Sequence, residues 1–295
     1  MKSVSILVPE TAVVEAVADP YYIFGAVNNF LRSSGREPLF DVKFVGLSKD
    51  VKLVDGAFTV HVHRQLSDVK KTDLILIPAL SGDLPAAVDA NKLDGKKCST
   101  HWGFTNEFRS MFPNVELVDG GIITEEQGLY SSGGAASYWN LLLYLVEKYT
   151  DRDTAILASK YFAIDIDRDS QSAFTMFTGQ KDHEDVEIRG TQEFIEQNYT
   201  ERITVDDLAK EFAIGRRSLE RRFKKATNNS IAEYIQRVKI EAAKRSFESS
   251  RKNITEVMFD VGYTDTKAFR TVFKKITGLT PIEYRNKYNK PVVVY

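Results

Sequence analysis

Two short segments near the C-terminal end carry basic and apolar residues in the same order, and their chemistry suits contact with a polyanion. Residues 219–227 read LERRFKKAT and residues 269–277 read FRTVFKKIT, so the segments repeat each other at an offset of 50 residues. In each segment two bulky apolar residues, four apart, share one side of a helix, and basic residues lie on the opposite side. Such a helix is suited to the major groove of DNA.

The residues around the first copy predict the helices that would position its basic segment. Thr204 and the acidic residues after it predict the start of a helix that continues through Phe212. Residues 213–215 form a turn, and residues 216–226 form the second helix, in which Leu219 and Phe223 face inward. This order predicts a helix-turn-helix unit.

The second copy repeats the design, and a long helix separates the two. Residues 255–261 are its first helix, 262–265 its turn and 266–276 its second helix. Between the copies, residues 231–247 show an unbroken helical pattern with Ile235, Val238 and Ala242 on one stripe. A stiff connector matters because neighbouring major-groove faces recur about every 34 Å along a duplex.

The net charge of −1 hides an asymmetry between the two halves of the chain. Residues 191–295 carry 21 Lys and Arg against 14 Asp and Glu, whereas residues 1–190 carry 19 against 27. A basic half suits double-stranded DNA, and an acidic half argues that it does not itself lie on DNA. With 295 residues, two domains are expected. We place them at 1–178 and 191–295, joined by a polar linker over 179–190, with Thr191 as the cap of the next helix.

The C-terminal half resembles the AraC/XylS-type DNA-binding domain over about residues 190–290. The resemblance rests on both copies, on the spacer and on FKK at 223–225, GY at 262–263, FKKITG at 273–278 and TPIEYR at 280–285. It implies that base contacts come from the early outward positions of each second helix. These positions are Arg217, Glu220, Arg221, Thr266, Lys267, Arg270 and Thr271.

The side-chain chemistry supports these positions unequally. Arg217 and Arg221 can each donate two hydrogen bonds to guanine O6 and N7, and Glu220 can accept one from cytosine N4. Any single arginine here could instead belong to a solvated helix face. Residues expected to meet phosphates are Lys224, Lys225, Arg237, Lys274 and Lys275.

The N-terminal half alternates apolar runs with helical stretches. Residues 4–8, 42–45 and 74–77 read as strands buried on both faces of a parallel sheet. Residues 21–31, with Pro20 in the first turn, and residues 138–149 read as helices. The predicted fold class is an α/β domain with a parallel sheet flanked by helices, followed by an all-α domain with two helix-turn-helix units.

This half resembles the PfpI-like, glutamine-amidotransferase-like domain at the front of one group of AraC-type regulators. LDGKK at 93–97, STHW at 99–102, FPNV at 112–115 and QS at 171–172 carry the resemblance, over about residues 3–175. The family's nucleophile elbow has no room here, because residues 79–95 are too few for a strand, an elbow and a helix. The composition of these residues predicts a turn over 81–85 and a short helix over 86–93. We therefore predict no enzymatic activity; the alternative is a PfpI-like amidase or hydrolase with a DNA-targeting domain.

Residues that could form a small-molecule site are few. Cys98 and His101 lie three apart, on opposite faces of a strand, which argues against a nucleophile and its base. His61 and His63 share a face without an evident third ligand, so neither a metal nor another cofactor is expected. Glu10, Glu15 and His101 are weak effector-site candidates.

Together these patterns predict a sequence-specific transcriptional regulator. Its partners would be double-stranded DNA and an unidentified small-molecule effector, and the acidic half would supply sensing and homodimerisation. One cysteine, no stretch of membrane-spanning length and no signal-peptide pattern lead us to expect a cytoplasmic protein with no membrane partner.

Overall fold

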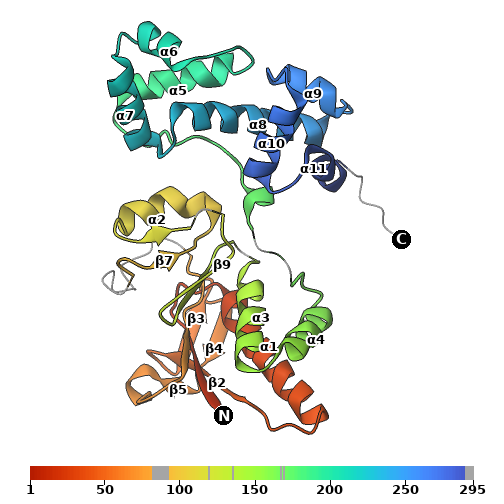
Figure 1. Ribbon diagram of the computed structural model, residues 1–295. Helices are drawn as coiled ribbons and strands as arrows, with labels where there is room; N and C mark the ends of the chain where they lie inside the picture. The colour runs from red at the N-terminus through yellow and green to blue at the C-terminus, as the bar shows by residue number, and fades with distance from the viewer. Residues whose placement is uncertain (82–92, 119, 135, 167, 169, 290–295) are drawn as a thin grey trace. The chain divides into compact units, whose positions relative to one another are not determined.

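The computed structural model describes residues 1–81, 93–118, 120–134, 136–166, 168 and 170–289 (Figure 1). Contacts divide the chain into two compact parts, unit 1 (Met1–Asp169) and unit 2 (Ser170–Tyr295). The division falls before the linker predicted over 179–190. It does so because the segment 170–181 is bonded to helices of unit 2, as described below.

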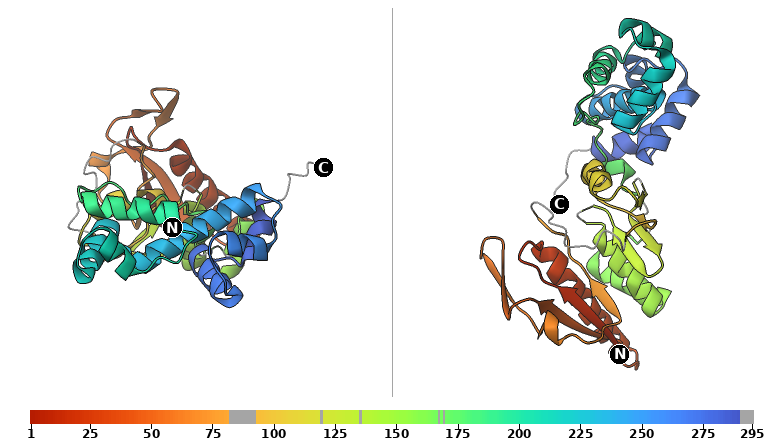
Figure 2. Two further views of the ribbon diagram at one scale, coloured as in Figure 1. Left: turned by 90° about the horizontal axis from the view of Figure 1, so that it is seen from above. Right: turned by 90° about the vertical axis from the view of Figure 1, so that its left-hand side faces the viewer.

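Unit 1 is built on a four-stranded sheet of order β5-β2-β1-β6, in which the pairings are parallel (Figures 1 and 2). Three further pairs, β3–β4, β9–β10 and β7–β8, form separate two-stranded sheets. The elements are, in order, β1 (Lys2–Leu7), α1 (Val14–Ser33), β2 (Phe40–Gly46), β3 (Asp50–Leu53), β4 (Phe58–His61), β5 (Arg64–Gln65), η1 (Leu66–Asp68), β6 (Leu74–Leu76), β7 (Lys97–Cys98), η3 (Trp102–Phe104), α2 (Thr105–Met111), β8 (Glu116–Leu117), β9 (Ile123–Glu126), β10 (Leu129–Ser132), α3 (Tyr138–Tyr149) and α4 (Arg152–Phe162).

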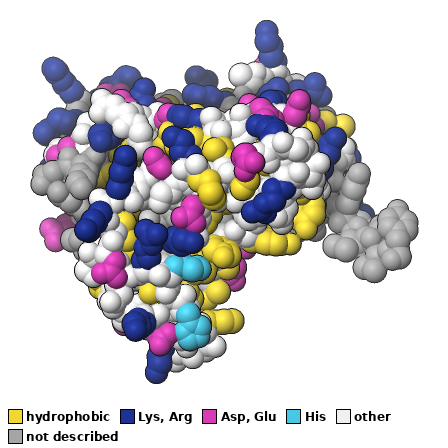
Figure 3. Space-filling view, turned by 90° about the horizontal axis from the view of Figure 1, so that it is seen from below, with side chains coloured by type: hydrophobic (Ala, Val, Ile, Leu, Met, Phe, Trp, Pro, Cys, Tyr) yellow, Lys and Arg dark blue, Asp and Glu magenta, His cyan; other side chains and the backbone are white. Residues whose placement is uncertain are grey.

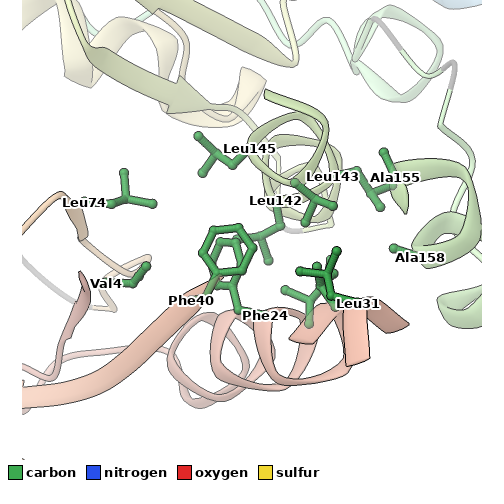
Figure 4. Packing of buried hydrophobic residues seen from close by; sticks show 13 residues of the cluster. Val4, Phe24, Leu31, Phe40, Leu74, Leu142, Leu143, Leu145, Ala155 and Ala158 are labelled. Carbon is green, nitrogen blue, oxygen red and sulfur yellow. The ribbon is translucent and has the colours of Figure 1, made fainter. Parts of the chain in front are cut away.

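The main core of unit 1 lies between this sheet and helices α1, α3 and α4. Phe24 and Leu31 of α1 meet Leu142 and Leu145 of α3, and the strands contribute Phe40 among others (Figure 4). These side chains are at most 3 % exposed. Full burial of such residues, about 1.5–3 kcal/mol each, is the main favourable contribution to folding of this unit. The predicted α/β class with a parallel sheet is confirmed.

Two details of unit 1 differ from the sequence prediction. Helix α1 begins at Val14, so Pro20 lies inside the helix instead of in its first turn. Strand β6 is not buried on both faces, because Ile75 is 55 % exposed; Ile77, just after the strand, is 57 % exposed. In the described part of the chain β6 hydrogen-bonds only to β1, which leaves it at the sheet edge.

The segment predicted to lack the nucleophile elbow falls largely outside the described residues. The predicted turn over 81–85 and the short helix over 86–93 are described only at Ser81 and Leu93. On either side of this gap, β6 belongs to the four-stranded sheet and β7 pairs with β8 in another. The two sheets are not hydrogen-bonded to each other in the described residues.

Unit 2 is helical. After η4 (Ser172–Phe174), its helices are α5 (Val186–Asn198), α6 (Val205–Glu211), α7 (Arg216–Thr227), α8 (Ile231–Ser249), α9 (Ile254–Asp260), α10 (Thr266–Thr277) and α11 (Pro281–Tyr288). The predicted helices are present with small shifts at their ends. Helix α5 is longer than predicted: Asp185 caps it, and Thr191 lies buried inside it with its hydroxyl donating to the Glu187 carbonyl at 2.8 Å.

The sequence repeat is also a structural repeat. Thr204–Asp207 and Asn253–Glu256 form capping boxes at the starts of α6 and α9. Ser230–Glu233 and Thr280–Glu283 do the same at α8 and α11. Helices α7 and α10 both end at a left-handed residue, Asn228 with φ 56° and Gly278 with φ 75°. The same local chemistry therefore starts and stops the helices of both copies.

Candidate nucleic-acid interface

Helices α7 and α10 each pack one apolar side and leave the other side in solvent. Leu219 and Phe223 of α7 are fully buried with Leu208 of α6. In α10, Phe269 and Phe273 are fully buried against residues of α8 and α9. The inner faces are therefore fixed by packing, and each helix is held as the second helix of a helix-turn-helix unit.

The outer faces carry the predicted base-contacting side chains. All seven are exposed: Arg217, Glu220, Arg221, Thr266, Lys267, Arg270 and Thr271. Two of them also have partners in the free protein. Glu220 Oε1 lies 3.6 Å from Arg216 Nε, and the Thr271 hydroxyl donates to the Lys267 carbonyl at 2.8 Å. These contacts are at the surface, where an ion pair contributes little, so the side chains can exchange them for DNA.

Arg222, next to Arg221 in the same basic run, faces the protein. Its guanidinium donates from Nε to Asp185 Oδ2 at 2.9 Å and from Nη2 to Glu187 Oε2 at 2.8 Å. These hydrogen bonds hold the pKa of the Asp185 carboxyl below its ordinary value. Arg222 therefore joins α7 to the start of α5.

The residues expected to meet phosphates fall into two groups. Lys224, Lys225, Lys274 and Lys275 are exposed near the ends of α7 and α10, and Lys224 Nζ donates to the Asn228 carbonyl at 2.7 Å. Arg237 lies instead on the connecting helix α8. It is half-buried, with its guanidinium carbon 5.8 Å from the centre of the Phe177 ring. This cation–π contact gives Arg237 a packing role that sequence spacing did not indicate.

In unit 1, Cys98 and His101 have different surroundings. Burial raises the pKa of the Cys98 thiol, which disfavours the reactive thiolate. His101 lies outside β7, where its Nδ1 accepts from the Gly103 N–H at 3.1 Å and burial lowers its pKa. The strand expected to carry both residues ends at Cys98, and His101 instead caps η3, so the predicted arrangement on opposite faces of one strand is not formed.

The other unit 1 candidates have ordinary surroundings. Glu10 and Glu15 are exposed. His61 pairs with Asp50 across β3 and β4, whereas the ring of His63 stacks on Tyr21 at 5.7 Å. Where the chain is described, no group of three His, Cys, Asp or Glu side chains could hold a metal ion. Figure 3 shows basic, acidic and hydrophobic side chains interspersed on the face that it presents, with histidines exposed among them.

Sequence reasoning missed a set of buried charges on α8. Within the described residues, the buried Asp, Glu, Lys and Arg side chains are Lys239, Glu241 and Lys244. The predicted stripe of Ile235, Val238 and Ala242 is only half-buried. Helical periodicity assigns polar residues to solvent, so it gave no signal of these three.

A known family model, described as a helix-turn-helix domain, matches residues 208–287. Two regulators of Pseudomonas aeruginosa match a longer part of the chain. HTH-type transcriptional regulator ArgR is 23 % identical over 212 residues, 72 % of this chain and 64 % of that protein. HTH-type transcriptional regulator GbdR is 26 % identical over 222 residues, 71 % of this chain and 58 % of that protein. The chain covers less than two thirds of the length of either relative.

Two solved structures were also found. The DNA-binding domain of AdpA, solved in complex with a target DNA, is 24 % identical and matches 35 % of this chain and 92 % of its own, with a TM-score of 0.34. Drosophila melanogaster DJ-1beta is 15 % identical and matches 56 % of this chain and 98 % of its own, with a TM-score of 0.41.

The packed inner faces and basic outer faces of α7 and α10 define the class of unit 2, a double helix-turn-helix domain of DNA-binding type. The chain is a homologue of the ArgR and GbdR regulators, and unit 2 belongs to the AraC type of helix-turn-helix domain. Both matches are longer than unit 2 and so extend into unit 1. No helix in the described ranges is long and apolar enough to cross a membrane.

Proposed function

We propose that this protein is a sequence-specific transcriptional regulator in which α7 and α10 read two major-groove segments of one DNA site. The observation that carries the proposal is the shared design of the two helices. Each buries two bulky residues and exposes arginine or lysine at the early outward positions. Arg217, Arg221 and Arg270 have the bidentate geometry for guanine, and the exposed lysines suit phosphates.

Unit 1 is proposed to sense a small molecule and to hold a homodimer without catalysing a reaction. The raised pKa and burial of Cys98 support a non-catalytic role, because an attacking thiol needs a low pKa and access. Glu10, Glu15 and His101 remain the residues proposed for the effector. A thermal-shift screen of amines, amino acids and carboxylates on the full chain tests sensing, since a ligand of the folded state raises the melting temperature.

The DNA-reading assignment is tested by two substitutions with different expected signatures. Arg221→Ala should weaken binding to a selected duplex by about 1–3 kcal/mol and relax the base preference at one position. Lys274→Ala should weaken selected and random duplexes alike, and lower the slope of log K against log salt by about one.

Fluorescence anisotropy at several salt concentrations measures both effects. Glu211→Ala, an exposed position on α6 outside the proposed contacts, is the matched control and should leave affinity and slope unchanged. An equal loss on selected and random duplexes for Arg221→Ala would refute its role in base reading.

A further inference from the structure

The middle of α8 holds three buried charged residues, and their polar contacts reach backbone atoms of other segments. Lys239 and Lys244 are 8 % and 4 % exposed, and Glu241 is 9 % exposed. Removing a charge from water costs several kcal/mol unless it is paired and hydrogen-bonded. The segments that these three side chains hold together therefore indicate why the charges are buried.

Lys239 links the turn of the second helix-turn-helix unit to the loop in front of the first helix-turn-helix unit. Its Nζ donates to the Gly262 carbonyl, in the turn of the second unit, at 3.1 Å and to the Glu201 carbonyl, in the loop between α5 and α6, at 3.4 Å. The ammonium also lies 5.5 Å from the centre of the Tyr263 ring. Burial lowers the pKa of Lys239. One side chain therefore ties the turn of the second helix-turn-helix unit to the loop that precedes the first one.

The backbones of the two units also touch directly beside Lys239. Gly262 has φ 73°, and a Cβ added there would lie 2.1 Å from the Thr200 carbonyl oxygen. No side chain larger than hydrogen fits this approach. The turn of the second helix-turn-helix unit therefore packs against the loop that precedes the first helix-turn-helix unit.

Glu241 and Lys244 bind the segment 170–181 at the start of unit 2. Lys244 Nζ donates to the Thr175 carbonyl and to Glu241 Oε2, the latter at 2.7 Å. Glu241 Oε2 also accepts from the Phe177 N–H at 3.1 Å. The pair thus satisfies one donor and one acceptor of this segment's backbone.

The same segment is also bonded to α11, to α5 and to the loop between α7 and α8. Tyr288 of α11 donates to the Ala173 carbonyl at 2.9 Å. At the other end, Gln192 of α5 donates to the Gln180 carbonyl at 2.8 Å, and Asn229 donates to the Gln180 side chain at 3.1 Å. The segment 170–181 is therefore bonded to α11, to α8, to α5 and to the loop between α7 and α8.

We infer that Lys239, Glu241 and Lys244 are positioning residues for DNA recognition: they fix the separation of α7 and α10 and so determine which spacing between two base-pair segments the protein accepts. The inference rests on the proposed function, because spacing has meaning only if both helices read DNA. It assigns specificity to residues that do not touch DNA.

The test uses the full chain and a duplex selected from a random library by the unaltered protein. Lys239→Met removes the donors and keeps the apolar stem. It should lower affinity for this duplex about tenfold, which corresponds to about 1.4 kcal/mol. It should also reduce the loss of affinity that follows from inserting two base pairs between the two contacted segments. The reason is that helix-turn-helix units that Lys239 no longer links can adopt more separations. Lys210→Met, which makes the same change at an exposed lysine of α6, is the matched control.

A second measurement keeps the inference separate from DNA binding. Spin labels at Glu211→Cys on α6 and Phe259→Cys on α9, in a Cys98→Ser background, report the separation of the units without DNA. Lys239→Met should broaden the distance distribution. Lys239→Arg, which keeps the charge with a longer reach, should shift it and covers the case in which the methionine variant does not fold.

An unchanged distance distribution together with an unchanged spacing penalty would overturn the inference. A wild-type protein that binds no duplex would overturn the proposed function, whereas broadening in the labelled Lys239→Met protein would still establish that Lys239 holds the two units together.

Discussion

Two neighbouring arginines of α7, Arg221 and Arg222, have different surroundings. Arg221 is exposed and is proposed to read a base, whereas Arg222 is 30 % exposed and forms ion pairs with Asp185 and Glu187 at the start of α5. The basic run in the sequence therefore contains both an exposed residue, for which we propose a contact with DNA, and a residue that bonds to another helix of unit 2. Sequence periodicity separates them because consecutive residues of a helix face directions about 100° apart.

We expect Arg222→Met to lower stability without changing base preference. Loss of the charge-assisted hydrogen bonds should lower the melting temperature only slightly, since the pair is partly exposed. Thermal unfolding of the full chain measures this, with Arg217→Met as the exposed control on the same helix. A change in base preference for Arg222→Met with unchanged stability would contradict the assignment.

The Asp185–Arg222 pair also predicts a pH dependence. The pKa of Asp185 is lowered in the folded state, so the pair stabilises the fold above the ordinary carboxyl pKa. This contribution is lost as the pH falls through the lower, folded-state value. The stability difference between the wild type and Arg222→Met should be constant from about pH 7 to pH 5 and shrink below about pH 4. A difference that grows on acidification would show that the pair is not the cause.

At the scale of elements, the repeat at residues 219–227 and 269–277 predicted most of unit 2. Capping residues such as Thr204 and inward residues such as Phe223 obey local rules of helix formation, so their positions can be read from sequence. Tertiary packing decided the rest. Pro20 is tolerated inside α1, and Lys239 is buried because neighbouring segments supply its carbonyl partners.

The close approach at Gly262 gives an element-scale prediction. Gly262→Ala forces a Cβ against the Thr200 carbonyl and a left-handed backbone on alanine, which should destabilise unit 2 by about 1–3 kcal/mol. Gly25→Ala, inside α1 with no atom within 4 Å of the new Cβ, should instead stabilise unit 1 by about 0.5–1 kcal/mol. Chemical denaturation of the two variants decides between these signs.

The segment 170–181 gives a second prediction at this scale. A fragment of residues 170–295 should unfold cooperatively, whereas a fragment of residues 182–295 leaves Glu241 and Lys244 without their backbone partners. The shorter fragment should be less stable by about 1–3 kcal/mol, the cost of unsatisfied buried polar groups. Equal midpoints of urea denaturation for the two fragments would show that the segment is a passive linker.

At the scale of the whole molecule, charge is divided between the two halves of the chain. The basic excess lies in the half that contains α7 and α10, and the acidic excess lies in the half that contains the parallel sheet. DNA binding should therefore depend steeply on salt through unit 2, since each neutralised phosphate releases counterions. Sensing by unit 1 would act through residues 170–181, which are bonded to α5 and α11 on either side of the two helix-turn-helix units in the sequence.

The central claim is that both repeated helices read one DNA site, and hydroxyl-radical footprinting of the selected duplex tests it most directly. The account predicts two protected segments for each chain, about one helical turn or 34 Å apart. Arg221→Ala should weaken one segment and Arg270→Ala the other. A single protected segment, or two segments that weaken together with either substitution, would contradict the claim that α7 and α10 each contact their own stretch of DNA.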